Sequence, residues 1–190
     1  MLKSVQKSET TFDEMQKILG SQKRAGLNEG LVSNKLRYDR LERAVNVIQK
    51  NEEKFVDAMI SDFGHRSPHQ SRVSDIALSI SSLRYAQKNL KRWRKSEKRS
   101  AIFPLNLLGA KARVDFQPLG VIGVISPWNF PVNLTFAPLA GILSAGNRVM
   151  IKPSEYTPET SNTMAEAISE EFDLSLIHIS APTRQEAISY

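Results

Sequence analysis

Residues 118–155 read PLGVIGVISPWNFPVNLTFAPLAGILSAGNRVMIKPSE, and no Lys, Arg, Asp, Glu or His occurs in this stretch before Arg148. Because 24% of the chain is charged, an uncharged run of this length must be buried in protein or in lipid. A membrane-spanning helix is disfavoured, since repeated prolines would interrupt its hydrogen bonds and Asn129 and Asn133 would place amides in hydrocarbon. We therefore expect the stretch to form the core of a folded domain.

Local signals divide this stretch and the residues after it into alternating strands and helices. The β-branched run 121–126 predicts a strand buried on both faces, and 148–152 predicts a second buried strand. A buried helix is expected over 131–145, stopped by Gly146, and another helix is expected to begin at Thr157. A βαβα unit of this kind predicts parallel strands joined by a right-handed crossover.

The residues before this unit are typical of a helical scaffold. Thr11 and Glu14 fit a capping box that begins a helix expected to end near Gly20. A second, longer helix is predicted from Ser33 to Gly64. A third helix is expected to begin at a Ser-Pro signal and to turn one set of apolar residues inward: Val73, Ile76, Ile80, Leu83 and Leu90. The sequence thus predicts an α/β chain in which N-terminal helices precede the first βαβα unit of a Rossmann-like domain.

We divide the chain into four segments. Residues 1–100 form the helical segment, and 101–117 form a linker with an edge strand. Residues 118–173 form a partial nucleotide-binding βαβα unit, and 174–190 form an atypical tail. Within the linker, alternating polar and apolar residues at 111–117 predict a strand with one wet face.

The net charge of +6 comes from one short run. Residues 88–100 hold seven basic residues and one acid, which leaves 19 of the 26 basic and 19 of the 20 acidic residues elsewhere. With Trp93 among them, these cations suggest a nucleic-acid contact. We favour a solvated helix end instead, because no recognition module surrounds the run and cations suit the negative end of the helix dipole. No nucleic-acid partner is expected.

Cysteine is absent, which excludes disulfides, thiolate metal sites and a cysteine nucleophile within these 190 residues. No metal site is expected. The first residues lack the apolar region of a secretory signal, so we expect a cytoplasmic protein with no membrane association.

Two polar positions follow the predicted strands, where ligands bind on parallel sheets. Lys152 and Glu155 have the spacing to hydrogen-bond the hydroxyls of a ribose, although a surface ion pair of little consequence explains them equally well. Asn129 is expected to be a buried amide that either faces a developing oxyanion or braces its loop, and the residues alone favour bracing. The common glycine-rich phosphate motifs are missing.

Several of these segments resemble one enzyme family. The segments GVIGVISPWNFP at 120–131 and AGNRVMIKPSE at 145–155 resemble the cofactor-binding half of the aldehyde dehydrogenase superfamily. The segment FGHRS at 63–67 and the helix after it are similar to the bacterial coniferyl aldehyde dehydrogenases, a branch of that superfamily. The resemblance extends from about Ser33 to Phe172.

The resemblance implies roles for the polar positions. Asn129 would be the catalytic side-chain donor of an oxyanion hole, and Lys152 and Glu155 would hold the adenosine ribose. A carboxylate at Glu155 would repel a 2′-phosphate, so NAD is the expected cofactor, with NADP possible. The other positions implied to bind the cofactor, mainly through backbone atoms, are Ile125, Ser126, Pro127, Trp128 and Ser154.

In that family a cysteine thiolate attacks the aldehyde, hydride passes to the nicotinamide, and a glutamate-activated water releases the acid. This chain has no cysteine, so we expect an N-terminal fragment that is inactive alone, from a homodimeric or homotetrameric parent that oxidises aldehydes with NAD(P). Residues 174–190 match nothing in the family and are expected to be sequence appended to a truncated reading frame. The alternatives are a non-catalytic interaction protein that keeps the fold, and a nucleic-acid-binding protein that uses residues 88–99.

Overall fold

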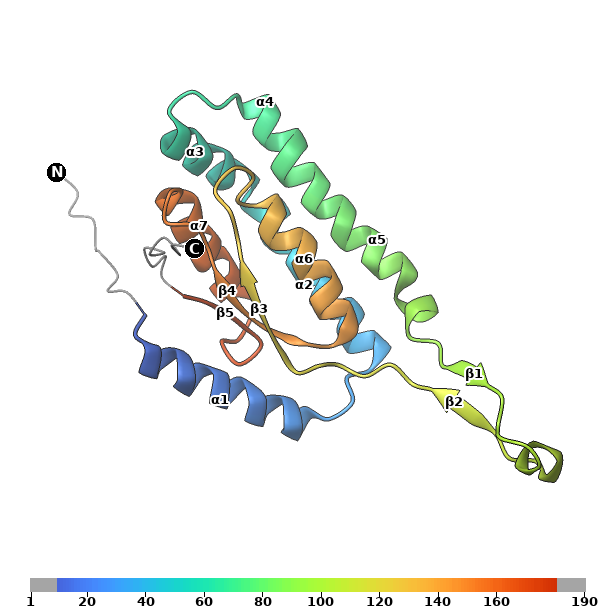
Figure 1. Cartoon of the computed structure of the whole chain (residues 1–190). Helices are drawn as coiled ribbons and strands as arrows, with labels where there is room; N and C mark the ends of the chain where they lie inside the picture. The colour runs from blue at the N-terminus through green and yellow to red at the C-terminus, as the bar shows by residue number, and fades with distance from the viewer. Residues whose placement is uncertain (1–9, 181–190) are drawn as a thin grey trace, which may run out of the picture.

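The computed structural model describes residues 10–180, while residues 1–9 and 181–190 lie outside the described part. Its centre is a three-stranded parallel sheet in the order β3-β4-β5 (Figure 1). The strands are β3 (Val121–Ile125), β4 (Arg148–Lys152) and β5 (Ile177–Ile179).

Two helices alternate with these strands, as the sequence predicts. Helix α6 (Asn133–Ala145) joins β3 to β4 and packs on both strands, and α7 (Pro158–Glu171) follows β4. Helix α6 ends at Gly146, whose φ of 83° lies in the left-handed region that a residue with a side chain seldom adopts. The predicted βαβα unit and the parallel pairing of its strands are confirmed.

The prediction that the first strand is buried on both faces is wrong. Gly123 is exposed and Ile125 is 71% exposed, whereas Val124 is buried. The reason is that the side chains of β3 alternate between the face that α6 covers and a face where Gly123 and Ile125 are exposed.

Helix α1 (Phe12–Glu29) contacts β3 and β4 from the side away from α6 (Figure 1). The Thr11 capping box is confirmed, with both of its hydrogen bonds present. The prediction that this helix ends near Gly20 is wrong, because a single glycine costs only about 1 kcal/mol in a helix and tertiary packing offsets it. Gly26 has such a packing role, since a Cβ there would lie 3.3 Å from Nε of Arg148.

The predicted helix from Ser33 to Gly64 is two helices, α2 (Asn34–Lys50) and α3 (Glu52–Phe63). The predicted caps at both ends are confirmed. The Ser33 side chain accepts a hydrogen bond from the amide of Leu36, and Gly64 adopts the left-handed conformation. The break is at Asn51, whose side chain donates to the main-chain oxygen of Val47 at 3.0 Å and competes with the backbone ladder.

The third predicted helix is a continuous rod of α4 (Pro68–Ser71), a π-helical turn (Arg72–Ala77) and α5 (Leu78–Trp93). The wider π turn shifts the phase of the residues before it, so that Asp75 is fully buried. Val73, predicted to point inward, is 49% exposed for the same reason.

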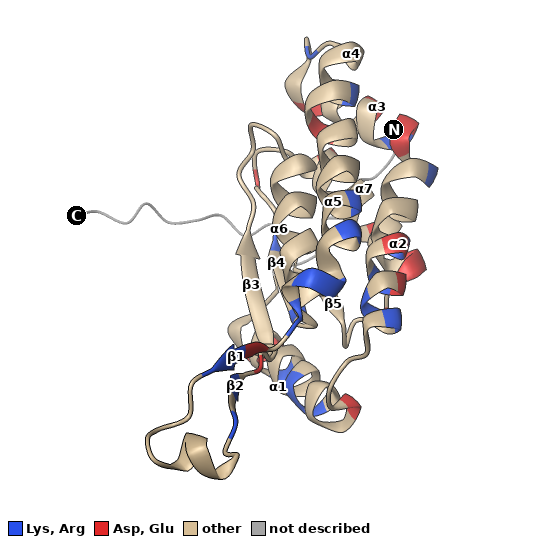
Figure 2. Cartoon of the chain, turned by 90° about the vertical axis from the view of Figure 1, so that its right-hand side faces the viewer, with Lys and Arg blue, Asp and Glu red and all other residues tan. Residues whose placement is uncertain are grey.

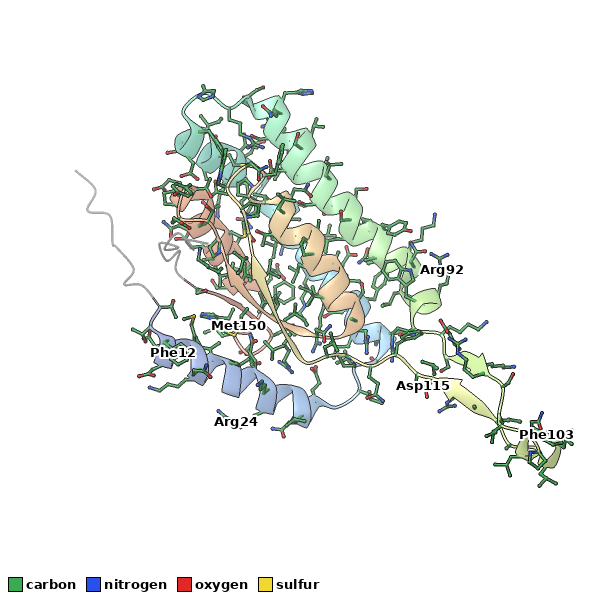
Figure 3. All side chains as sticks on the ribbon, in the orientation of Figure 1. Phe12, Arg24, Arg92, Phe103, Asp115 and Met150 are labelled. Carbon is green, nitrogen blue, oxygen red and sulfur yellow. The ribbon has the colours of Figure 1, made fainter. Side chains whose placement is uncertain are left out.

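Between α5 and β3 the chain forms an extended arm that projects away from the rest of the molecule (Figure 1). Strands β1 (Glu97–Arg99) and β2 (Ala112–Val114) pair antiparallel, and a 3₁₀ turn (Leu105–Leu108) lies between them. Every residue of β2 is exposed, so the prediction of a strand with one wet face is wrong. Phe103, near the tip, is 74% exposed (Figure 3).

The basic run begins on α5 and continues into the arm (Figure 2). It was predicted to be the last turns of a helix and the exit from it; the helix ends at Trp93, and the exit includes β1. Lys91 and Arg92 lie in the last turn of α5, where cations suit the helix dipole. Arg94 donates to the side chain of Asn34 and so joins α5 to α2.

The segment predicted to be an atypical tail contributes β5 to the sheet. Leu176 and Ile177 are buried, and Ile177 pairs with Val149 of β4. The rest of that segment, residues 181–190, lies outside the described part.

The core lies between the helices and the covered face of the sheet. Phe55 of α3 and Phe136 of α6 are fully buried and meet edge to face, with ring centroids 6.5 Å apart. Within residues 10–180, no helix is both long enough and apolar enough to cross a membrane.

Candidate cofactor and substrate site

The candidate residues meet at the carboxyl ends of β3 and β4. Ile125 is in register with Lys152, and the amide of Ser126 donates to the main-chain oxygen of Lys152 at 2.9 Å. Because parallel strands end at the same edge, the loop that carries Asn129 and the turn that carries Glu155 leave the sheet side by side. The structure therefore brings both predicted groups of site residues to one edge.

The loop after β3 is open. Ile125 is 71% exposed, Trp128 is 52% exposed, and Pro127 is also exposed. Ser126 is buried, and its Oγ lies 2.7 Å from Oγ1 of Thr135 on α6. The Ser126 amide already donates to Lys152, so its main-chain oxygen is the group left for a ligand, while its hydroxyl accepts from Thr135 and holds the loop to the helix.

Asn129 is exposed, so the prediction of a buried amide is wrong. The reason is that its loop lies beyond an edge strand, where no described element covers it. Among residues 10–180, no group bonds to its side-chain amide, whereas its main-chain oxygen accepts a 2.7 Å hydrogen bond from Nη1 of Arg66. The Asn129 side chain is therefore free to donate outward, and the loop is braced through its backbone.

Arg66 was singled out by no functional pattern in the sequence. It is 8% exposed, forms an ion pair with Asp75, and lies over two rings, 4.8 Å from the centroid of Phe63 and 5.2 Å from that of Phe130. Cations bind the faces of aromatic rings through the ring quadrupole. Arg66 thereby joins the loop of Asn129 to the end of α3.

Asp75 caps α6 from a different helix. Its Oδ1 accepts hydrogen bonds from the amides of Val132 and Asn133, each 3.1 Å long. Burial raises the pKa of Asp75, while the Asn133 amide and the charge of Arg66 offset part of that effect. No local sequence signal could reveal this cap, because the accepting carboxylate and the two donating amides lie more than 50 residues apart.

Asp62 of α3 closes the next helix in the same way. Its two carboxylate oxygens accept from the amides of Glu159 at 3.0 Å and Thr160 at 2.8 Å. Thr157, expected to cap α7, makes no side-chain cap bond, so the remote carboxylate takes its place. A helix N-terminus is a common phosphate site, but a carboxylate already occupies the amides at the starts of α6 and α7.

The Lys152–Glu155 pair is formed, with Nζ 3.2 Å from Oε2 and each side chain 21% exposed. It is therefore largely covered, unlike a solvated surface pair. Ser154 between them is buried, and its Oγ accepts from the amide of Tyr156 at 3.2 Å, which shapes the turn. Lysine donates and glutamate accepts, so the pair offers both partners that a ribose diol requires.

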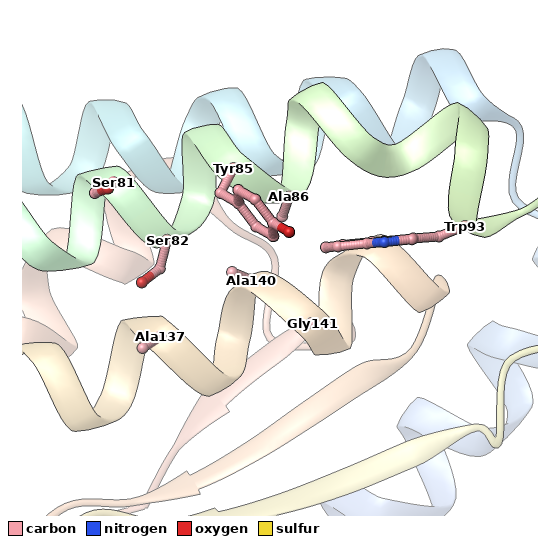
Figure 4. A pocket seen from close by; sticks show the side chains of 8 residues that line it. All are labelled: Ser81, Ser82, Tyr85, Ala86, Trp93, Ala137, Ala140 and Gly141. Carbon is pink, nitrogen blue, oxygen red and sulfur yellow. The ribbon is translucent and has the colours of Figure 1, made fainter.

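One further hollow lies between α5 and α6, separate from the strand ends (Figure 4). It encloses about 350 Å³, and the rings of Tyr85 and Trp93 stand at one end with centroids 5.8 Å apart. None of the predicted site residues lines it. Within residues 10–180, no group of three or more His, Asp or Glu side chains is placed to hold a metal ion.

Comparison with known proteins identifies relatives of this chain. The coniferyl aldehyde dehydrogenase of Pseudomonas sp. is 48% identical over 161 residues, which are 85% of this chain and 33% of that protein. A probable coniferyl aldehyde dehydrogenase of Caulobacter vibrioides is 46% identical over 84% of this chain and 33% of its own length. The chain thus spans about a third of the length of the curated relatives it matches.

Solved structures agree with the fold. The substrate-bound AldH of Staphylococcus aureus superposes with a TM-score of 0.80 at 27% identity, over 87% of this chain and 35% of that one. The model of the aldehyde dehydrogenase family matches residues 5–187. The resemblance seen in the sequence is confirmed, and this chain belongs to the aldehyde dehydrogenase family.

Proposed function

We propose that the protein to which this chain belongs oxidises an aldehyde to a carboxylic acid with NAD. The observation that carries the proposal is the shared sheet edge, where the Asn129 amide, which has no partner among residues 10–180, and the covered Lys152–Glu155 pair leave adjacent parallel strands. Ligands of open α/β sheets bind at this edge. A donor for the substrate and a diol-binding pair for the cofactor suit such a reaction.

The residues present fit the adenosine ribose of a nicotinamide cofactor. Nζ of Lys152 can donate to one ribose hydroxyl while Oε2 of Glu155 accepts from another, at little cost in ordering since the two are already paired. The bound nicotinamide supplies the hydride acceptor. The Glu155 charge disfavours a 2′-phosphate, which makes NAD the preferred cofactor, with NADP as the second.

A solved structure with the same fold holds NADP. The succinic semialdehyde dehydrogenase of Streptococcus pyogenes, 17% identical with a TM-score of 0.78, is solved with NADP⁺. At this identity the likeness concerns the fold alone.

Asn129 is the proposed donor to the substrate oxygen. As negative charge develops on the aldehyde oxygen, an amide N–H fixed in the right direction stabilises it more than the ground state. Loss of one such donor lowers kcat by roughly 10²–10³-fold in enzymes that use one. Coniferyl aldehyde is the first substrate to test, because the relatives at 46% and 48% identity are named for it.

The experiment uses a chimera, because this chain has no cysteine. In the chimera, the matched segment of this chain replaces the corresponding third of the Pseudomonas enzyme, which supplies the rest. We expect NADH formation from coniferyl aldehyde, and a roughly 10²–10³-fold fall in kcat on Asn129→Ala. Asn28→Ala, at an exposed asparagine near the end of α1, is the matched control and should leave kcat unchanged.

Each failure has a distinct meaning. A folded chimera that forms no NADH would contradict the proposed reaction. An active chimera whose kcat is insensitive to Asn129→Ala would reduce Asn129 to a loop-bracing residue.

The proposal includes a homodimeric or homotetrameric parent in the cytoplasm. Apolar side chains on the arm support self-association, since Ile102 is 76% and Leu108 is 81% exposed. Sedimentation of the chimera with and without Leu108→Ser measures whether the arm contributes to assembly.

A further inference from the structure

A buried ion pair lies beside the candidate site with no part in its chemistry. The side chains of Arg66 and Asp75 are 6% and 0% exposed. Burying two charges costs several kcal/mol each, and apolar replacements of such pairs are often as stable or more stable. Nε of Arg66 also has no hydrogen-bond partner in the described part of the chain. A contribution to folding stability therefore does not explain why this buried pair is present.

The pair contacts the loop of Asn129 at both of its ends. Arg66 donates to the main-chain oxygen of Asn129 and lies over the ring of Phe130. Asp75 accepts from the amides of Val132 and Asn133. Because the two charges bind each other, these contacts form one clamp on residues 129–133.

The clamp governs a side chain that has no other restraint. The amide of Asn129 is exposed and unpartnered among residues 10–180, so only its main chain sets its direction. Phe130 precedes Pro131, which disfavours helical backbone angles at Phe130. With the oxygen of Asn129 held by Arg66, the peptide between Asn129 and Phe130 has a fixed orientation.

The π turn accounts for the position of the clamp. In a regular α-helix, a set of inward residues that includes Val73 would leave Asp75 outside it. The extra residue in the turn Arg72–Ala77 moves Asp75 to the buried side instead, beneath the start of α6. Such turns cost stability and occur frequently at functional sites.

We propose that Arg66 and Asp75 are positioning residues, which set the orientation of residues 129–133 and thereby aim the Asn129 amide at the substrate oxygen. The inference rests on the proposed role of Asn129. Neither residue touches the substrate, so both act through the loop.

The first test measures kcat in the chimera. Arg66→Met and Asp75→Asn should each lower kcat roughly 10–100-fold and leave the KM for NAD within about twofold, as misplacement of a catalytic group does. Arg66→Lys keeps the positive charge but loses the planar set of guanidinium donors, so its kcat should lie between those of Arg66→Met and the unsubstituted chimera. Arg84→Met, which breaks the exposed ion pair between Arg84 and Glu42 on α2, is the control and should change neither constant.

The double mutant separates positioning from general stability. If Arg66 acts through the amide, Arg66→Met should have little further effect on kcat in the Asn129→Ala background. Multiplicative effects of the two substitutions would overturn the inference, because the clamp would then act independently of that amide.

The second test measures amide hydrogen exchange in this 190-residue chain and does not depend on activity. In Asp75→Ala, which removes the accepting oxygen, the amides of Val132 and Asn133 should exchange at least tenfold faster, while that of Ile151 in the central strand should be unchanged. Equal acceleration at all three would show a role in fold stability and overturn the inference. If Asn129→Ala leaves kcat unchanged, the proposed function of Asn129 fails, and this measurement still decides whether the pair holds the loop.

Discussion

The guanidinium of Arg37 occupies the space that a side chain at residue 146 would need. A Cβ on Gly146 would lie 2.7 Å from Cζ of Arg37, and Nη1 of Arg37 donates to the oxygen of Ser144 at 2.9 Å. Arg37 on α2 thus closes the C-terminus of α6, as Asp75 closes its N-terminus. The N-terminal helices are more than scaffold, because they satisfy both ends of the helix that links β3 to β4.

Gly146→Ala should destabilise the chain through two effects. The φ of 83° adds backbone strain of about 1 kcal/mol for a residue with a Cβ, and the Arg37 guanidinium is buried and cannot yield freely. We expect a loss of about 2–4 kcal/mol in the free energy of unfolding, measured by urea denaturation.

The matched control for that substitution is Gly64→Ala. Gly64 has a φ of 71° at a helix end, but a Cβ there meets nothing within 4 Å, so only the strain of about 1 kcal/mol is expected. Arg37→Ala should bring the cost of Gly146→Ala down to that of the control. If both glycine substitutions lower the free energy of unfolding of the original chain equally, the Arg37 side chain moves aside for the new Cβ, and the steric part of this prediction is wrong.

Asp62→Ala should destabilise the chain by about 1–2 kcal/mol, because it removes the cap of α7. Three hydrogen bonds to Glu159 and Thr160 are lost, including a 2.7 Å bond from the Thr160 hydroxyl. Asp57→Ala, at an exposed aspartate of the same helix, is the comparison and should cost under about 0.5 kcal/mol. Similar losses for both substitutions, by thermal or urea unfolding, would show that the amides of α7 find other partners.

The elements whose signals are local were predictable. The strand 148–152 has the predicted bounds, and the helix start at Ser33 and the helix ends at Gly64 and Gly146 are where capping chemistry indicates. Each of these signals acts within one helical turn or one short run of residues. The parallel pairing followed from their order along the chain.

Features that depend on remote contacts were not predictable. Whether Gly20 ends a helix depends on packing, and the break at Asn51 and the π turn before Leu78 shift the apolar pattern without a sequence mark. In the site, the positions of Lys152 and Glu155 followed from the strand end. The clamp on the Asn129 loop could not be predicted, because more than 50 residues separate Asp75 from that loop. In the sequence, Asp75 is one of several polar residues on a helix.

The stability contributed by Asp75 should depend on pH. Its pKa is raised in the folded chain, mainly by burial, so the folded state binds more protons than the unfolded state above the ordinary aspartate value of about 3.9. The stability of the original chain relative to Asp75→Asn should therefore be greatest at low pH and fall as pH rises through this window. Urea denaturation of both chains from about pH 3.5 to 7 measures it, and a relative stability that rises with pH would contradict the burial effect.

Cofactor choice should depend on Glu155. In a Trp93→Phe background, Trp128 is the remaining tryptophan and lies in the loop beside the Lys152–Glu155 pair, so its fluorescence reports adenine nucleotides that bind this chain. Lys152→Met should weaken AMP binding about tenfold, which is 1.4 kcal/mol, through the loss of a donor to the ribose.

Glu155→Gln should narrow the preference for AMP over adenosine 2′,5′-bisphosphate, because the charge that repels the 2′-phosphate is removed. Lys50→Met removes the lysine of the Lys50–Glu171 pair, which has an Nζ to Oε1 distance of 2.5 Å, and should leave both affinities unchanged. An unaltered preference in Glu155→Gln would mean that the carboxylate does not face the 2′ position, and the basis for expecting NAD would be lost.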